Sequence, residues 1–189
     1  QLEGSEVSLL DHDELTAVDN YTQNEYRALN TFLRDGRSGN KEHDNRMKES
    51  CEVLIGAMAK TKPLKAPLKV YRGYKFDETS HQANFVSKLK EAHKNGQIMK
   101  LDGFVSTCKT GVAEAFEGTC VVEIEASQGI NAQEVSTNDT EEEFLINHGC
   151  DYEVKHVEQN SDGFVTVHLK QLNNGAKPSE ESKKKTQPV

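Results

Sequence analysis

Apolar positions in the first part of the chain follow helical spacing. Two short helical patterns fit residues 14–34 and end at Gly36, with an apolar face formed by Tyr26, Leu29, Phe32 and Leu33. A longer helix over 43–60 is predicted by a single apolar stripe of Met47, Cys51, Leu54, Ile55 and Met58. After a predicted strand at 68–74, a further helix carries Phe85, Leu89 and Ala92 on one side.

The remainder of the chain changes to the alternating pattern of β-strands. Strands are predicted at 98–101, 103–106, 119–126, 141–147, 151–158 and 164–172. Helices followed by strands indicate an α+β domain. We expect this domain to span 14–172, with a flexible, acidic segment at 1–13. The stretch 173–189 has almost nothing to bury and is expected to be a disordered tail or linker.

Composition and charge narrow the class of function. The 189 residues are enough for roughly one domain, and 31 acidic against 23 basic residues give a formal net charge of −8. This excess of acid argues against binding to nucleic acids or anionic membranes, which both reward Lys and Arg. No apolar run approaches the roughly 18 residues of a membrane span. Because the sequence begins with neither Met nor a signal segment, we interpret it as a fragment or processed form of a longer protein.

The cysteines give little reason to expect a metal. Cys51, Cys108, Cys120 and Cys150 are far apart and form no C-x-x-C spacing, so buried free thiols are the simplest interpretation. His148 and Cys150 together would supply only half of a metal site. We therefore expect no metal.

Charge is distributed unevenly along the sequence. The segment 60–75 contains no acid and carries the basic residues Lys60, Lys62, Lys65, Lys69, Arg72 and Lys75. The segment 110–154 is rich in acids and contains no Lys or Arg. The two segments could form an anion-holding wall opposite a carboxylate-rich one, although each could equally be a solvated surface.

Three short motifs carry candidate chemistry. In Tyr71-Arg72-Gly73, the planar guanidinium suits a phosphate and the glycine lets a ligand approach the backbone. Ser106 and Thr107 end a predicted strand, where hydroxyls can orient a neighbouring carboxylate. Glu141 and Glu143 would share one face of a strand, about 6–7 Å apart, and a carboxylate there can stabilise an oxocarbenium-like transition state. Each motif also has an ordinary interpretation, as a surface arginine, strand-edge hydroxyls and an acidic turn.

Taken in order, these motifs resemble the Arg–Ser–Glu class of mono-ADP-ribosyltransferases, in its branch of bacterial toxins and phage exoenzymes. The matching residues are Val-Tyr-Arg-Gly at 70–73, Gly-Phe-Val-Ser-Thr at 103–107 and Glu-x-Glu at 141–143. The stretch Tyr21-Thr-Gln-Asn-Glu-Tyr26 resembles the N-terminal helical signature of that class, and the resemblance covers about 15–172. It implies N-terminal helices packed on a split two-sheet β-core, with NAD bound in the cleft between the sheets.

The resemblance also implies an activity and a set of residue roles. The class cleaves the nicotinamide–ribose bond of NAD and transfers ADP-ribose to a protein side chain. Arg72 would hold an NAD phosphate, and the backbone of Gly73 would bind the nicotinamide amide. Ser106 would hold Glu143, and Thr107 would support the strand end. Glu143 would bind the nicotinamide ribose and stabilise the positive charge that develops on it.

The acceptor is implied by the first glutamate of the Glu-x-Glu motif. In relatives, a glutamate at the position of Glu141 goes with arginine as the target, where it would orient and deprotonate the guanidinium. The stretch between 127 and 140, which relatives use to recognise their target, lacks the aromatic residue expected for asparagine modification. Aromatic residues expected against the NAD are Tyr21, Tyr26 and Phe116. Because 110–154 has no Lys or Arg, a second residue for the NAD phosphates is not assigned.

Two other functions stay open at this point. An NAD glycohydrolase would use water as the acceptor, against which Glu141 argues mildly. A catalytically idle structural or interaction domain of a larger virion or effector protein would not need an intact set of Arg72, Ser106 and Glu143. The expected partners are NAD and a target protein with an accessible arginine, without nucleic acid or membrane. We expect a soluble monomer that is secreted, injected into a host cytoplasm, or associated with a virion.

Overall fold

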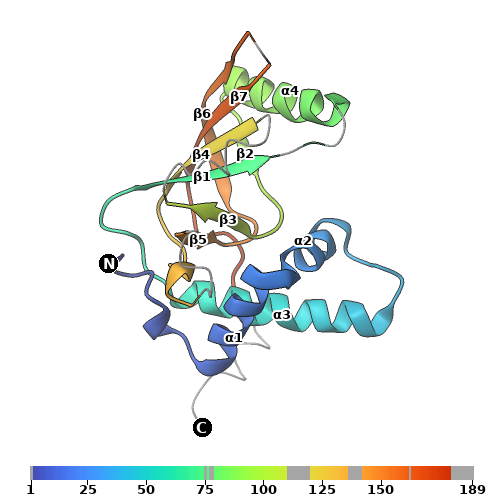
Figure 1. The fold of residues 1–189 in the computed structure, drawn as a ribbon, viewed down its shortest axis with the longest axis vertical. Helices are drawn as coiled ribbons and strands as arrows, with labels where there is room; N and C mark the ends of the chain where they lie inside the picture. Colours follow the sequence, from blue (N-terminus) through green and yellow to red (C-terminus); the bar gives the residue numbers. More distant parts are fainter. Residues whose placement is uncertain are drawn as a thin grey trace.

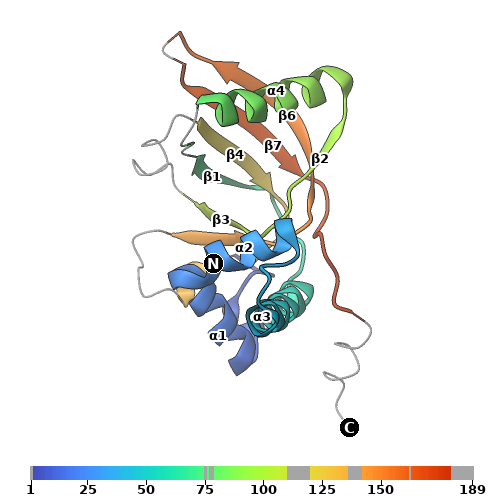
Figure 2. The same ribbon diagram turned by 90° about the vertical axis from the view of Figure 1, so that its right-hand side faces the viewer.

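A β-sheet runs through the centre of the molecule, with helices at both of its ends (Figure 1). The computed structural model describes residues 2–74, 76, 79–109, 120–135, 142–161 and 163–179. None of the helices in these ranges is long and apolar enough to cross a bilayer. The view in Figure 2 shows that the N-terminal helices gather below the sheet, whereas α4 (Thr79–Asn95) lies along its upper strands.

A continuous helical run opens the domain. It consists, in chain order, of α1 (His12–Asn20), a π-helical turn (Tyr21–Glu25) and α2 (Tyr26–Asp35). The two helical patterns predicted over 14–34 are therefore one run with a wider turn in the middle. A capping box starts it, because Asp11 and Glu14 each accept the other's backbone N–H at 2.9 Å. Gly36 ends it with a φ of 80°, as predicted.

The next helix, α3 (Lys41–Lys60), packs against α1 and α2. Its buried face consists of Met47, Cys51, Leu54, Ile55, Ala57 and Met58, which confirms the predicted apolar stripe. The last residue, Lys60, forms an ion pair with the buried Glu14 at 2.5 Å, so α1 and α3 are joined by charge as well as by packing. This helical layer also buries Phe104, Ile130 and Leu145, which come from the sheet side.

The sheet has the strand order β2-β6-β7-β4-β1-β3-β5. Its strands are β1 (Leu68–Tyr74), β2 (Ile98–Lys100), β3 (Val105–Cys108), β4 (Cys120–Ala126), β5 (Glu143–Ile146), β6 (Asp151–Gln159) and β7 (Val165–Gln171). Neighbours are antiparallel except for β4 and β7, which run parallel. The predicted α+β class is confirmed.

The sheet is split between β1 and β3. These two strands share a single residue pair, Tyr71 opposite Cys108, whereas β1 and β4 pair along their whole length. Five strands therefore form one part, and β3 with β5 forms the other, which agrees with the expected split β-core. The five-stranded part and α4 share an apolar cluster with β3 and β5, to which Val70, Leu89, Ile124, Phe144 and Ile146 belong.

The ends of the described chain pack on the domain. Near the N-terminus, Ser5 is fully buried, and its backbone O accepts the N–H of Asn131 at 2.8 Å. Near the other end, Asn147 donates from its side chain to the backbone O of Asn174 at 2.6 Å and of Ala176 at 2.8 Å. The expected flexible segment at 1–13 and the start of the expected tail at 173 therefore belong to the packed domain as far as the described residues reach. Long-range hydrogen bonds, which composition does not reveal, hold both segments.

Candidate active site

Three neighbouring strands bring the sequence motifs together. Tyr71, Cys108 and Glu143 lie opposite one another across β1, β3 and β5. Arg72 follows Tyr71, and its Nη1 donates a hydrogen bond to the backbone O of Ser106 at 3.0 Å. The hydroxyl of Ser106 in turn donates to Oε1 of Glu143. Residues that are 34 and 37 positions apart in the sequence thus form one connected group.

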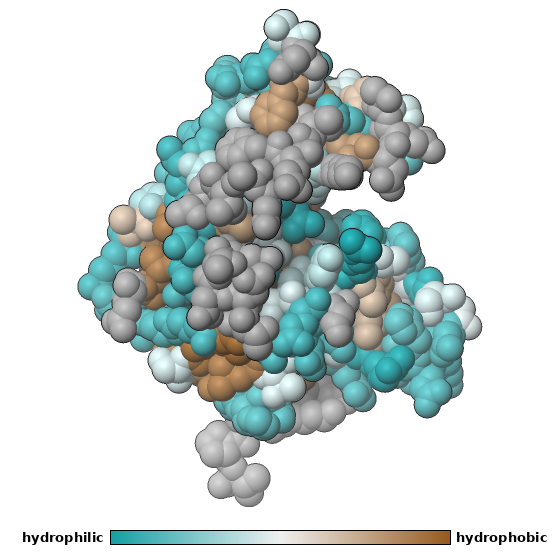
Figure 3. Space-filling model, in the orientation of Figure 1, coloured by the Kyte–Doolittle hydropathy of each residue, from teal (hydrophilic) through white to brown (hydrophobic). Residues whose placement is uncertain are grey.

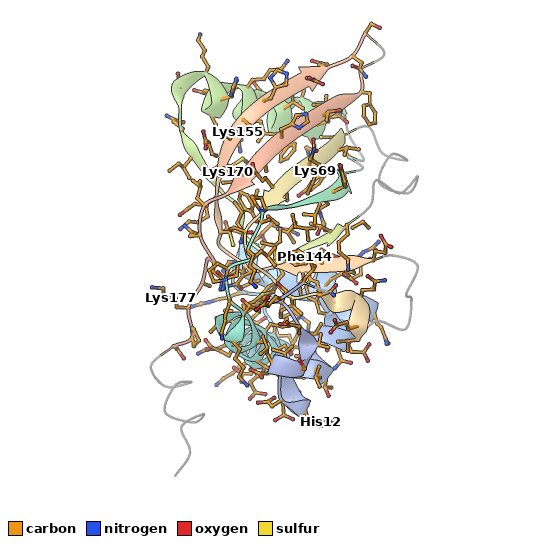
Figure 4. All side chains as sticks on the ribbon, turned by 90° about the vertical axis from the view of Figure 1, so that its left-hand side faces the viewer. His12, Lys69, Phe144, Lys155, Lys170 and Lys177 are labelled. Atoms are coloured by element: carbon orange, nitrogen blue, oxygen red, sulfur yellow. The ribbon has the colours of Figure 1, made fainter. Side chains whose placement is uncertain are left out.

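The carboxylate of this group is buried. Glu143 is only 4% exposed, and a buried charge is costly unless hydrogen bonds compensate for the lost water. The hydroxyl of Ser106 supplies one such bond. Beside it, Thr107 donates from Oγ1 to the backbone O of Phe144 at 2.7 Å and fastens β3 to β5. Figure 4 labels Phe144 at the level where the sheet meets the helices. A fixed, poorly solvated carboxylate interacts strongly with a nearby positive charge.

Aromatic side chains hold the guanidinium of the group. Cζ of Arg72 lies 5.1 Å from the ring centroid of Tyr74, at cation–π distance. The Tyr74 ring packs on Phe76 at 6.1 Å and on Phe85 at 5.4 Å. Arginine has five N–H donors, and the bond to the backbone of Ser106 uses one of them. The next residue, Gly73, is exposed, so its backbone is open to a ligand.

A hydrogen-bonded group from the helices holds the chain in front of β3. The side-chain amide of Asn30 donates to the Tyr21 hydroxyl at 3.0 Å and to the backbone O of Phe104 at 3.2 Å. Its Oδ1 accepts the N–H of Phe104 at 2.9 Å, and the Tyr21 hydroxyl donates to the O of Phe104 at 3.1 Å. Gly103 has a φ of 96°, and a Cβ on it would lie 2.9 Å from Oδ1 of Asn30. The predicted strand at 103–106 therefore begins later, at Val105.

The two tyrosines expected against NAD have different surroundings. Tyr21 is fully buried, with its ring 5.7 Å from that of Phe104. Burial raises the pKa of Tyr21 to about 12, and the nearby charges of Arg72 and Glu143 also act on it. A ring without exposed surface does not face a ligand. In this structure Tyr21 instead supports the site through its hydrogen bond to the backbone O of Phe104. Tyr26 is partly exposed, and its contact with NAD stays a prediction.

The structure also identifies site residues that the sequence motifs did not reveal. Asn30 holds the segment in front of β3, as described above. His148, in the turn between β5 and β6, accepts the N–H of Gly103 on Nδ1 at 2.8 Å. Burial lowers the pKa of His148, in keeping with a neutral ring that accepts a hydrogen bond. A polar residue within an otherwise apolar helix face was the available signal for Asn30. His148 was noted with Cys150 as half of a metal site and not as the acceptor of the Gly103 N–H.

The strand expected at 141–147 is shorter in the structure. β5 covers Glu143–Ile146, and the preceding residue, Glu142, has a left-handed φ of 44°. The alternation that would place Glu141 and Glu143 on one face assumed an extended backbone at Glu142, so that geometric argument is wrong. Glu141 and Phe116, two of the predicted site residues, lie outside the described residues.

A notch opens on the right-hand side of the molecule in Figure 3, between the part that carries α4 and the part that carries α2. The binding of NAD in the cleft between the two parts of the sheet stays a prediction. Within the described residues, no group of three or more His, Cys, Asp or Glu side chains could hold a metal ion. That the reaction uses no metal stays a prediction.

The fold and this group of residues define a class of protein, and the sequence places the chain in it. The chain belongs to the ADP-ribosyltransferase exoenzyme family, whose profile matches residues 4–177. Among characterised proteins, it is similar to Exoenzyme T of Pseudomonas aeruginosa, with 32% identity over 143 residues. That match covers 75% of this chain but 28% of Exoenzyme T, so the chain spans roughly a quarter of that relative.

Solved structures show the same fold. The ADP-ribosyltransferase toxin Plx2a from Paenibacillus larvae superimposes with a TM-score of 0.71 at 21% identity, over 88% of this chain and 89% of the toxin. Exoenzyme S from Pseudomonas aeruginosa, solved with human 14-3-3 protein beta and bound to Carba-NAD, gives a TM-score of 0.70 at 21% identity. The match covers 89% of this chain and 78% of Exoenzyme S.

Proposed function

We propose that this domain is a mono-ADP-ribosyltransferase that takes ADP-ribose from NAD and transfers it to an arginine of a target protein. The observation that carries the proposal is the connected group of Arg72, Ser106 and Glu143 at the split in the sheet. Membership of the ADP-ribosyltransferase exoenzyme family supports the reaction class. Exoenzyme S, which shares the fold, was solved bound to Carba-NAD, and this supports NAD as the substrate.

In the first half of the proposed reaction, the bond between nicotinamide N1 and ribose C1′ breaks. Nicotinamide leaves as a neutral molecule with the bonding electron pair, and positive charge develops on the ribose. Glu143, which is buried and held by Ser106, would stabilise that charge more strongly in the transition state than in the bound substrate. Thr107 would support this position through its bond to β5.

The other end of NAD would be held by Arg72 and Gly73. The guanidinium of Arg72 is fixed by the backbone of Ser106 and the ring of Tyr74, so it would meet a phosphate without losing much rotamer freedom. Gly73 follows it at an exposed position of β1, where its backbone would bind the nicotinamide amide. Tyr26 would add an aromatic surface from the helical layer, and Phe116 is proposed to cover the nicotinamide.

In the second half, a guanidino nitrogen of the acceptor forms the new bond to ribose C1′. Arginine is almost always protonated, so this nitrogen must lose a proton before it can attack. Glu141 is proposed to bind the guanidinium and to accept this proton. The products are nicotinamide, ADP-ribosylarginine and a proton, and no other reactant is needed.

Hydrolysis of NAD is the second candidate activity. The connected group of Arg72, Ser106 and Glu143 is complete without any residue for a protein acceptor, so water could take the place of arginine. By analogy with Exoenzyme S, which was solved with a 14-3-3 protein, and with Exoenzyme T, we propose a bacterial effector that acts on host proteins.

The test follows nicotinamide release and ADP-ribose transfer to agmatine, a small guanidino acceptor, in the same reactions. Glu143→Gln keeps the size of the side chain and removes its charge, and we expect it to lower both activities by about 100-fold or more. Glu141→Gln should lower transfer to agmatine and leave much of the nicotinamide release that is measured without agmatine. Glu125→Gln, at an exposed position of β4, is the matched control and should change neither. Nicotinamide release by the unaltered protein without any transfer would favour the glycohydrolase.

A further inference from the structure

Lys109 follows β3 directly and contacts two segments that lie on either side of Glu141 in the sequence. Its backbone N donates to the backbone O of Glu142 at 3.1 Å, which extends the pairing of β3 with β5 by one residue. Its Nζ donates to Oδ1 of Asn131 at 2.7 Å and to Oε1 of Gln133 at 2.6 Å. The chain runs from Gln133 to Glu142 through Glu141, so one lysine holds both ends of the stretch that contains this residue.

The side-chain partners of Lys109 are themselves anchored. Asn131 is 6% exposed, and its backbone N donates to the O of Ser5 at 2.8 Å. Just before it, Ile130 and Leu145 pair across the outer edge of β5 with two backbone hydrogen bonds of 2.8 and 2.9 Å. Gln133 lies in the short 3-10 helix Ala132–Glu134. Lys109 is therefore tied to a well-held part of the domain.

The charge of Lys109 suits its surroundings. Burial lowers the pKa of Lys109, while the carboxylates of Glu142 and Glu134 act in the opposite direction. Its side-chain partners are amide oxygens, which accept hydrogen bonds from an ammonium group. Lys109 is also the last basic residue before 110–154, a stretch with many acids and no Lys or Arg. It supplies a positive charge next to a segment in which three glutamates, Glu141 to Glu143, are consecutive.

Glu142 shows why such a tether is useful. Among the described residues, it is the one non-glycine residue with a positive φ, at 44°, a conformation that L-residues adopt at some cost. It stands between Glu141, which is proposed to bind the target arginine, and Glu143, which is proposed to bind NAD. The chain enters β5 through this left-handed residue, and the hydrogen bond from the backbone N of Lys109 holds the carbonyl of Glu142.

We propose that Lys109 is a positioning residue for the acceptor half of the reaction. It holds Glu142 and the 3-10 helix, the described ends of the stretch that contains Glu141, whereas the hydrogen bonds that join Arg72, Ser106 and Glu143 do not involve it. This inference rests on the proposed transferase function. It predicts that transfer and hydrolysis respond differently, because a misplaced Glu141 slows transfer to arginine and leaves the cleavage of NAD by water unaffected.

The test compares Lys109→Met, which keeps the length of the side chain without its donors, with Lys109→Arg, which keeps a charged donor. In Lys109→Met, we expect kcat/KM for transfer to agmatine to fall by about 10-fold or more, while nicotinamide release measured without agmatine and the KM for NAD change less than about twofold. Lys109→Arg should recover most of the transfer. Gln133→Ala, which removes one of the two partners, should show the same separation to a smaller extent. Lys88→Met, at an exposed position of α4, is the matched control.

Equal loss of transfer and nicotinamide release in Lys109→Met, or transfer equal to that of the unaltered protein, would overturn the proposal. Hydrogen exchange followed by mass spectrometry judges the tether independently of any activity. Lys109→Met should speed exchange in peptides that cover 128–135 and 142–146 and leave those from β4 and β7 unchanged. If the unaltered protein neither cleaves NAD nor transfers ADP-ribose, the proposed function fails. Unchanged exchange in Lys109→Met, by contrast, refutes the tether itself.

Discussion

The hydrogen bonds between Asn30 and Phe104 offer a quantitative test of how the helical layer supports the active-site strand. Asn30 is 9% exposed and takes part in three hydrogen bonds, one with the Tyr21 hydroxyl and two with the backbone of Phe104. In Asn30→Ala all three are lost. The O of Phe104 keeps its bond from Tyr21, but its N–H is left without the partner seen here.

The expected loss of stability follows from these contacts. A net hydrogen bond contributes about 1 kcal/mol, and a buried donor left unsatisfied costs about 1–3 kcal/mol. Two lost hydrogen bonds and one unsatisfied donor add up to about 3–5 kcal/mol of the free energy of unfolding for Asn30→Ala. For a domain of this size, that corresponds to a fall of about 6–20 °C in Tm.

Urea denaturation followed by circular dichroism measures this loss. The matched control is Asn45→Ala on the exposed face of α3, which should change the free energy of unfolding by no more than about 0.5 kcal/mol. A loss below about 1 kcal/mol in Asn30→Ala would show that the three hydrogen bonds do not hold β3 in place. Because β3 carries Ser106, we also expect nicotinamide release to fall in Asn30→Ala at temperatures where the variant is still folded.

Three further predictions concern pH, packing and the guanidinium. Burial lowers the pKa of His148, so below about pH 6.5 the unfolded chain takes up a proton that the folded protein does not, and the free energy of unfolding falls as the pH drops. His148→Asn, whose Oδ1 can still accept the N–H of Gly103, should lose part of this acid sensitivity in urea denaturation at pH 5.5 and 7.5. Gly129→Ala would place a Cβ 2.5 Å from the backbone O of Leu145, and we expect it to lower the free energy of unfolding by about 1–3 kcal/mol, measured in the same way. Arg72→Lys keeps the charge but loses the planar fork, so the KM for NAD should rise by about 10-fold or more in a nicotinamide-release assay, and an unchanged KM would argue against a phosphate contact.

The sequence was most informative where local pattern decides the structure. The apolar stripe of α3 and the glycine that ends α2 follow from helical periodicity and backbone preference, which act over a few residues. The strands that carry Arg72, Ser106 and Glu143 are short, and β5, which carries Glu143, is buried at every position rather than on one face. That these three side chains meet could be expected from family resemblance, whereas periodicity alone does not specify which strands become neighbours.

Long-range contacts explain what the sequence analysis missed. Ser5 and Asn174 lie in predominantly polar segments. The backbone O of Ser5 nevertheless accepts a hydrogen bond from Asn131, more than a hundred positions away, and the backbone O of Asn174 accepts one from Asn147, nearly thirty positions away. The strand that alternation predicted over 141–147 begins only at Glu143, because Glu142 has a left-handed φ of 44°, in keeping with the acidic turn that was the alternative interpretation of this motif. Lys109 gave no motif at all, since its partners come from two separate parts of the chain.

The central claim is that Glu143, held by Ser106 beside Arg72, cleaves NAD and that the ADP-ribose reaches an arginine. The most direct measurement is the transfer of labelled ADP-ribose from NAD to proteins of a cell lysate, with Glu143→Gln in parallel. The account predicts a labelled protein band with the unaltered domain, its loss in Glu143→Gln, and release of the label by hydroxylamine, as for an arginine linkage. Equal labelling by both proteins, or a label that resists hydroxylamine, would contradict it.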